Sequence, residues 1–145
     1  MTRTDKYLTL MVYVLMADGV VHDMERELLN LMIDNVGLNK RLVDKYKRMI
    51  EKGPVKGIDK NFEKISRDLD PSTLSGMIRD AYLMADADGD IHPSEIDVIN
   101  RFLRYAGIPE ERFEEIEMWA RESIAHLKRG VILFTKESLH PFAVI

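Results

Sequence analysis

Cysteine is absent from the 145-residue chain, and this absence excludes several kinds of site. Disulfide bonds, iron–sulfur clusters, zinc sites with cysteine ligands and thiol nucleophiles all require it. A metal ion bound by this chain would therefore have only histidine, carboxylate and carbonyl ligands. The length and the 46% content of hydrophobic residues are those of one globular domain.

Long hydrophobic runs and a strong excess of one charge are also missing. The most apolar stretch, YLTLMVYVLMA at residues 7–17, is interrupted by Thr9 and is shorter than the roughly 18–20 residues that span a bilayer. It lacks the small-x-small cleavage site of a signal peptide. The 25 acidic and 21 basic residues give a net charge of -4, so we expect no nucleic-acid partner. These features predict a cytoplasmic protein without a transmembrane segment.

The chain contains an internal repeat at an offset of 70 residues. ADGVVHDMERELLNLMIDNVGL at 17–38 aligns with ADGDIHPSEIDVINRFLRYAGI at 87–108, and seven of the 22 aligned positions are identical. Hydrophobic positions continue the match on both sides of this segment. Within it, they follow an i, i+1, i+4, i+5, i+8 pattern that only a helix presents on one face.

This pattern predicts an all-α single domain of about seven helices. Two three-helix repeats, at about 5–51 and 75–121, are expected to pack around a pseudo-two-fold axis, joined by a linking helix within about 56–70. Residues 122–145 form a C-terminal extension. Its segment GVILFT at 130–135 either continues the last helix or forms a short strand-like piece, and the sequence leaves both alternatives open.

Glycine and proline mark the expected helix ends. Gly37 and Gly107 follow the second helix of each repeat, where a left-handed residue is favoured, and Gly19 and Gly89 follow the first. Pro93 and Pro109 are expected in first helical turns, where proline loses no hydrogen bond. Asp70-Pro71 marks a break before the second repeat.

Both repeats carry the polar signature Asp-Gly-x-x-His-x-x-Glu. Its acids are Asp18 and Glu25 in the first copy and Asp88 and Glu95 in the second, and their spacing from the hydrophobic stripes places them toward the packed side of a helical corner. Glu25 and Glu95 either cap the helix, three residues after His22 or His92, or bind a metal ion, or do both.

A cation would explain the position of the two aspartates. An acid in the last turn of a helix faces the negative end of the helix dipole, which costs about 0.3–1 kcal/mol. We expect either a salt bridge or a bound divalent ion, such as Mg, Ca, Mn or Zn, to compensate this cost. Nearby polar residues would be further ligands, or would hydrogen-bond to the ligating carboxylates: His22, His92, Asp86 and Asp90.

An ordinary calcium-binding EF-hand is excluded despite the DADGDIHPSE segment at 86–95. The first ligand position of such a loop would be Met84, which has no oxygen ligand. The first copy retains only Asp18 and Glu25 of the expected ligands.

LMADGVVHDMERELLNLMIDNVGL and MADADGDIHPSEIDVINRFLRYAGI resemble the two signatures of the TerB-like family, which includes tellurite-resistance TerB proteins and the N-terminal domain of DjlA-type membrane co-chaperones. The resemblance covers roughly residues 5–125. It implies an all-helical domain with an acidic, divalent-metal-binding patch that acts in stress-response complexes, together with protein partners, near the inner membrane face. The chain departs from the family in its C-terminal extension and in having no J-domain.

The remaining candidates concern interaction surfaces and rival functions. Residues 40–67 hold ten Lys or Arg against four acids, which indicates either a solvated helical face or a peripheral contact with acidic lipids or a partner through Lys45, Lys52 and Lys56. Trp119 is expected in the core. A non-enzymatic cation-binding module is favoured over a carboxylate-bridged metalloenzyme, which would carry Glu-x-x-His motifs, and over a metal-free scaffold.

Overall fold

A computed structural model describes residues 2–17, 23–35, 37–52 and 57–136, and within them it contains helices but no strand. The α-helices are α1 (Arg3–Leu15), α2 (Asp23–Asn35), α3 (Lys40–Lys52), α4 (Ile58–Ile65), α5 (Pro71–Ala85), α6 (Pro93–Tyr105) and α7 (Phe113–Phe134). Two short 3-10 helices, η1 (Asp86–Asp88) and η2 (Glu110–Arg112), precede α6 and α7. The predicted all-α fold with seven helices is confirmed.

The helix bounds follow the 70-residue repeat of the sequence. Both ends of α6 lie 70 residues after the ends of α2, and α5 ends 70 residues after α1. Gly37 and Gly107 have positive φ angles of 72° and 82°, as predicted for residues that follow a helix. After α6, the Gly107 and Ile108 amides donate to the Arg104 and Leu103 carbonyls, which is a Schellman motif.

Proline begins two helices of the second half. Asp70 is the N-cap of α5, where its carboxylate accepts from the Thr73 amide at 2.8 Å, and Pro71 follows in the first turn. Pro93 is the first residue of α6, as predicted. Pro109 differs from the prediction: its extended backbone caps η2, so it lies before the helical turn.

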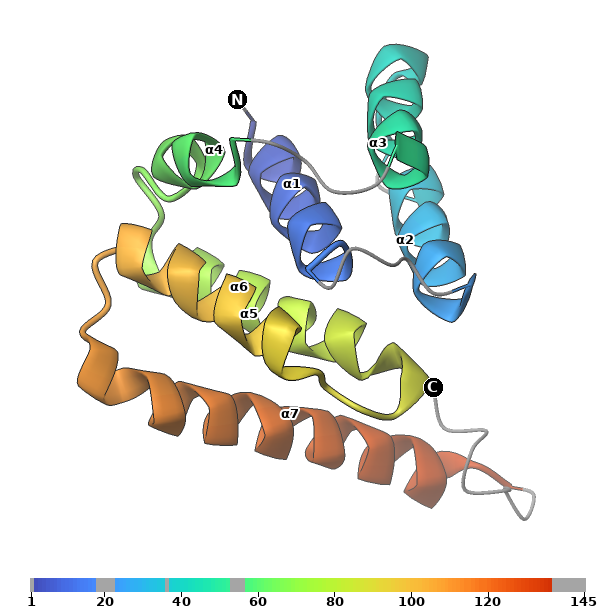
Figure 1. Cartoon of the computed structure of the whole chain (residues 1–145). Helices are drawn as coiled ribbons and strands as arrows, with labels where there is room; N and C mark the ends of the chain where they lie inside the picture. Colours follow the sequence, from blue (N-terminus) through green and yellow to red (C-terminus); the bar gives the residue numbers. More distant parts are fainter. Residues whose placement is uncertain (1, 18–22, 36, 53–56, 137–145) are drawn as a thin grey trace.

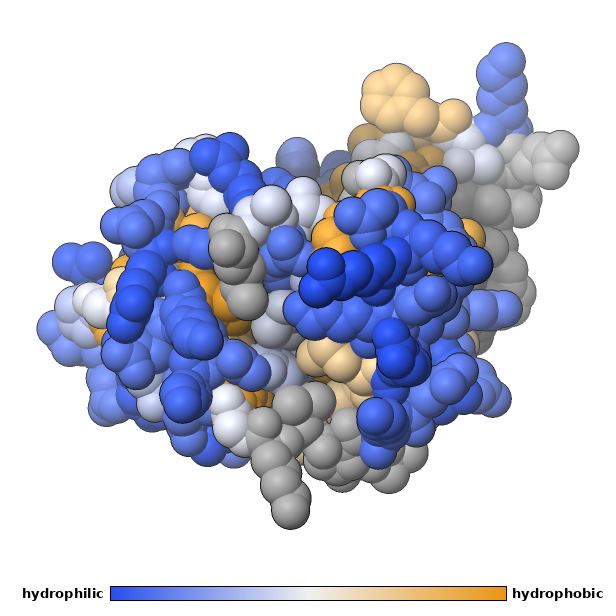
Figure 2. Space-filling model, turned by 90° about the horizontal axis from the view of Figure 1, so that it is seen from above, coloured by the Kyte–Doolittle hydropathy of each residue, from blue (hydrophilic) through white to orange (hydrophobic). Residues whose placement is uncertain are grey.

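The centre of the fold is α1, which contacts α2, α3, α4, α5 and α6 (Figure 1). All residues from Leu8 to Met16 are buried, including Thr9. This explains why 7–17 is the most apolar stretch, since a helix enclosed by other helices is hydrophobic all round. Seen from above, the surface around this core is mostly hydrophilic, and hydrophobic side chains show in a hollow between two lobes (Figure 2).

The linking helix α4 joins the two halves through one aromatic ring. Phe62 is fully buried, and its ring meets the Tyr13 ring of α1 and the Phe102 ring of α6 edge to face, at centroid distances of 5.4 and 5.3 Å. Asn61 donates a hydrogen bond to the Tyr13 hydroxyl. The linker is therefore part of the core and holds α1 and α6 together.

The last helix resolves the alternative left open for residues 130–135. The segment GVILF belongs to α7, and the backbone becomes extended at Thr135. α7 is the longest helix and runs along one edge of the molecule, beside α5 (Figure 1). Among the described residues, no helix is long and apolar enough to cross a membrane. Residues 137–145 lie outside the described part of the chain.

Candidate functional site

The second copy of the acidic motif forms the corner between α5 and α6. α5 ends at Ala85, so Asp88 lies in η1, beyond the last turn in which the sequence placed it. Gly89 follows with a φ of 88°, and His92 is the N-cap of α6. The chain therefore reverses within seven residues and brings the start of α6 next to the end of α5.

Glu95 is a buried capping residue. Its side chain is only 3% exposed, and its Oε1 accepts a hydrogen bond from the His92 amide at 3.0 Å. This is the predicted capping-box contact, and the negative charge lies at the positive end of the α6 dipole. The capping interpretation is therefore confirmed for Glu95.

The other polar residues of this corner have different surroundings. The Asp86 carboxylate forms an ion pair with Lys128 of α7 at 2.6 Å, and the Asp86 side chain is 15% exposed. Asp86 thereby ties η1 to α7 and has its own compensating cation. Asp90 is exposed and His92 is half-buried.

The first copy lies mostly outside the described residues. This applies to Asp18, Gly19 and His22, and the side chains of Glu25 and Asp88 are not described either. In the described part of the chain, no three His, Asp or Glu side chains are grouped closely enough to hold a metal ion. Of the four proposed ligands, only Glu95 has a described side chain.

Two contacts bring the corners of the two halves close to each other. Ala17, the residue before Asp18, lines a polar cavity of about 350 Å³ together with residues of α6, among them Ser94 and Asp97. In the opposite direction, α2 contacts η1, the element that contains Asp88. Described residues on both sides of the first motif, Ala17 and those of α2, therefore lie near elements of the second half.

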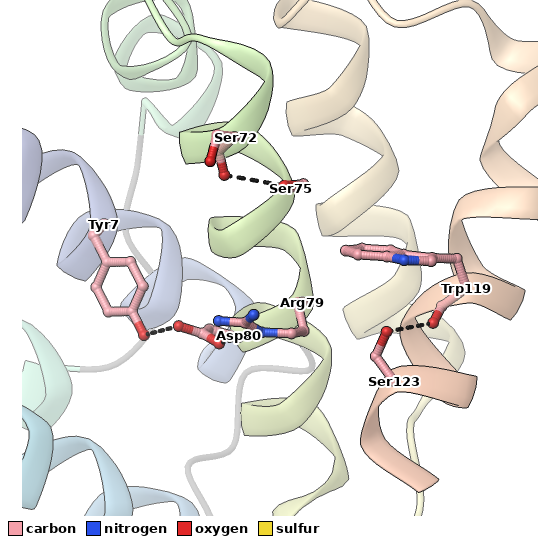
Figure 3. A network of polar contacts seen from close by, with 7 residues as sticks. All are labelled: Tyr7, Ser72, Ser75, Arg79, Asp80, Trp119 and Ser123. Atoms are coloured by element: carbon pink, nitrogen blue, oxygen red, sulfur yellow. Dashed lines mark hydrogen bonds and ion pairs between the residues drawn. The ribbon is translucent and has the colours of Figure 1, made fainter. Parts of the chain in front are cut away.

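A second polar feature lies between α1 and α5. The Tyr7 hydroxyl donates to Asp80 Oδ2 at 2.7 Å, and Arg79 Nε donates to Asp80 Oδ1 at 3.1 Å (Figure 3). Burial, together with the neighbouring Asp80 carboxylate, raises the pKa of Tyr7 above its ordinary value, so the phenol remains a donor. This network separates two cavities, of about 350 and 500 Å³, that share Asp80 in their walls.

Trp119 is not a core residue, and the prediction that placed it there is wrong. It is 40% exposed and lies in the walls of the 500 Å³ cavity and of an apolar cavity of about 270 Å³. The core positions of α7 are taken by Phe113, Ala120 and Ile124, so Trp119 lies at the margin of the buried stripe. Figure 3 shows the indole beside α5, with the Ser123 hydroxyl bonded to the Trp119 carbonyl at 2.9 Å.

We call the surface made by these two cavities the α5–α7 groove. Its apolar lining includes Leu74, Ile78, Leu83, Trp119 and Leu127, and Arg79, Asp80 and His126 supply polar groups. Sequence reasoning missed this groove. The only signal for it was the single tryptophan, and the repeat pattern paired Trp119 with Met49, which is partly buried against the core.

The basic segment is partly described. Lys45 and Lys52 are exposed on α3, and Arg41 and Arg48 are exposed at positions that share the same helix face. Lys56 lies outside the described residues. Lys47, on another face, pairs with Asp34 of α2 at 3.0 Å.

Comparison with known proteins identifies one family. A family model described as "Tellurite resistance protein TerB" matches residues 4–118, which is most of the chain. The matched region ends within α7, before the end of this helix. No curated protein and no solved structure matches the chain.

Proposed function

The chain belongs to the TerB family of tellurite resistance proteins, and from this premise we propose that its two Asp-Gly motifs form one divalent-cation site on a non-enzymatic protein-interaction domain. The proposed ligands are Asp18, Glu25, Asp88 and Glu95. Carboxylates prefer hard cations, so Mg, Ca and Mn are suitable ions, and Zn is suitable if a histidine joins the site.

The observation that carries this proposal is the adjacency of the two corners. Ala17 shares a cavity with α6 residues from Ser94 to Arg104, and α2 contacts η1. Four carboxylates that converge from two such corners repel one another, and a divalent cation removes this repulsion. The capping bond of Glu95 supports the same role, because it holds one carboxylate in a fixed, buried position.

The contacts among helices also support the predicted pseudo-two-fold relation of the halves. If α1 is exchanged with α5 and α2 with α6, the α1–α6 contact becomes the α5–α2 contact, and both occur. The α1–α3 and α5–α7 contacts correspond in the same way, whereas the α2–α3 contact has no counterpart of similar extent between α6 and α7. In the proposed arrangement, one ion lies near the axis and takes an Asp and a Glu from each half.

The protein-facing surface in this proposal is the α5–α7 groove. It combines a half-exposed tryptophan with aliphatic walls and a few charged groups, which is the composition of many protein-binding surfaces. We propose that its partners are other components of a stress response.

The test is metal-dependent unfolding of the full chain. With a divalent ion at about 100 times its Kd, the fold should gain about 2.7 kcal/mol. The variant Asp18→Asn with Asp88→Asn should lose this gain, and without metal it should melt at or above the parent because repulsion is relieved. Elemental analysis of the purified protein, with and without chelator, identifies the ion.

A charge-matched control separates the site from general electrostatics. Asp44→Asn with Asp68→Asn removes two exposed acids outside both motifs, so its metal response should equal that of the parent. If millimolar magnesium, calcium, manganese and zinc all leave the parent's melting curve unchanged, the acids serve as caps and ion pairs instead. A hydrolytic or redox activity that is lost with the metal would support the metalloenzyme.

A further inference from the structure

The carboxyl-terminal end of α7 carries an unusual set of exposed hydrophobic side chains. Val131, Ile132, Leu133 and Phe134 are 45%, 52%, 67% and 89% exposed, although they are consecutive residues of one helix. We call these four residues the α7 tip. Leu127, one turn before it, is also 56% exposed.

The position of the tip follows from the parallel packing of α5 and α7. Leu74 shares a cavity with Ile116 near the start of both helices, and Asp86, just after α5, pairs with Lys128. α5 therefore ends where α7 still has six residues to run, and α7 lies along the outer edge of the bundle (Figure 1).

The distribution of the apolar side chains around the helix points to the kind of partner. Successive helical residues are rotated by about 100°, so four consecutive residues cover the whole circumference. A protein groove binds one face of a helix, through residues at i, i+3, i+4 and i+7. A helix end that is hydrophobic on every side instead suits an apolar environment that surrounds it, such as the hydrocarbon of a lipid bilayer.

The charges next to the tip are mainly basic. Residues 126–136 contain Lys128, Arg129 and Lys136 and no acid, and Glu137 follows them in the sequence. Lys128 is bound to Asp86, whereas Arg129 and Lys136 are exposed two residues before and two residues after the tip. Basic groups that flank a short apolar segment suit the anionic head groups above the hydrocarbon of a bilayer.

Hydrogen bonds at the end of α7 also lower the free-energy cost of moving this helix end out of water. The Thr135 hydroxyl donates to the Val131 carbonyl at 2.6 Å, and the Thr135 amide donates to the Ile132 carbonyl at 3.3 Å. Two of the carbonyls that end a helix without a partner are thereby satisfied. Four residues extend about 6 Å along the axis, a depth that fits the boundary between head groups and acyl chains.

From these observations we propose that the α7 tip inserts into the surface of an anionic membrane. The four apolar side chains enter the upper acyl region, and Arg129 and Lys136 contact the head groups. This contact is peripheral, since the apolar segment is far shorter than a membrane span. It is independent of the cation site, because the tip contains none of the proposed ligands.

The test is cosedimentation of the full chain with vesicles of phosphatidylcholine alone and with about one third phosphatidylglycerol. The parent should bind the anionic vesicles, and less at high salt. Ile132→Ser with Phe134→Ser should reduce binding by at least about tenfold. The matched control is Met24→Ser with Leu31→Ser, which replaces two residues of α2 that are 59% and 57% exposed and should leave binding unchanged.

A fluorescence measurement checks insertion directly. The chain has a single tryptophan, so Trp119→Phe provides a background without tryptophan. A tryptophan introduced as Phe134→Trp should shift its emission to shorter wavelength when anionic vesicles are added, whereas one introduced as Leu31→Trp should not. An unchanged spectrum at position 134 would overturn the proposal.

Other outcomes assign the tip to another occupant and also overturn the proposal. Self-association of the parent that Ile132→Ser with Phe134→Ser abolishes, without vesicle binding, would identify a second copy of the chain. Vesicle binding that is lost in Lys45→Gln with Lys52→Gln, but kept in the tip variant, would move the membrane contact to α3. In Figure 1, α3 and α7 lie on opposite sides of the bundle, so these two variants test different surfaces.

Discussion

Substitutions of Glu95 can separate its capping role from its proposed metal-binding role, because glutamine preserves the cap and removes the charge of the metal ligand. In the fold, Glu95 Oε1 accepts the His92 amide, and the side chain is buried. Glu95→Gln keeps an acceptor at this position and removes the negative charge. Glu95→Ala removes both and leaves a helix-start amide without its acceptor.

The two substitutions should differ in stability without metal. Glu95→Gln loses the interaction of the charge with the helix dipole, which is about 0.3–1 kcal/mol. Relief of repulsion among the proposed ligands offsets part of this loss. Glu95→Ala also loses the cap, so its total cost should be about 1–3 kcal/mol.

The response to metal gives the decisive difference. An ion concentration of about 100 times Kd should add about 2.7 kcal/mol to the free energy of unfolding of the parent. For a domain near this size, this gain corresponds to a rise of roughly 5–11 °C in Tm. Both Glu95 variants should lose most of this rise. The assay is thermal unfolding followed by circular dichroism, with and without the ion found by elemental analysis.

The control is Glu122→Gln, an exposed acid on α7 that should retain the full rise. A full metal response in Glu95→Gln would refute the assignment of Glu95 as a ligand. Equal stability of the Gln and Ala variants without metal would refute the capping energy derived from the 3.0 Å bond.

Three further predictions concern the fold that supports the site. Tyr46→Phe removes the hydroxyl that donates to Asp5 at 2.8 Å and should cost about 1.5–3 kcal/mol in urea unfolding at pH 7. Burial raises the pKa of Asp5, but hydrogen bonds from Thr2 and Tyr46 outweigh it and hold this pKa below its ordinary value. The stabilisation that comes from the lowered Asp5 pKa is therefore present above the ordinary pKa of 3.8 and is lost as the pH falls through the lower pKa of the folded protein. The difference in free energy of unfolding between Tyr46→Phe and the parent should therefore shrink when the pH is lowered, and should not shrink when it is raised. Phe62→Ala should cost about 3–5 kcal/mol, because it opens a cavity between α1, α4 and α6, and a loss below 1 kcal/mol would show that α4 is not part of the core. Gly107→Ala meets no neighbouring atom but keeps a φ of 82°, so its expected cost of about 1 kcal/mol in the same unfolding assay comes from the backbone alone.

Much of the helical architecture was predictable because its signals are local. The 70-residue repeat correctly related α2 to α6, since both helices contain the same hydrophobic period and end before a glycine. The cap at Glu95 was predictable for the same reason, because a capping box depends on residues three apart. The boundaries near Pro109 and Asp88 were less accurate, because 3-10 turns at helix ends have no distinct sequence pattern.

The surfaces that decide partners were not predictable in this way. Trp119 was assigned to the core from its match with Met49, but α7 uses Ala120 and Ile124 against α5 and leaves the indole at the edge. The ion pair between Asp86 and Lys128 joins residues 42 positions apart and depends on how far α7 runs along α5. A sequence repeat does not contain this information, because the two halves differ in the length of their third helix.

The sequence by itself determined the helices, their order and the paired acidic motifs, because helix periodicity, caps and turn glycines act over a few residues. The tertiary structure alone decided that α1 lies at the centre, that α2 lies against η1 of the other half, and that α7 runs past the end of α5. The physical reason is that each amphipathic helix specifies which face is buried but not which helix covers it. That choice depends on the packing of the whole core, and it also sets which apolar residues remain exposed.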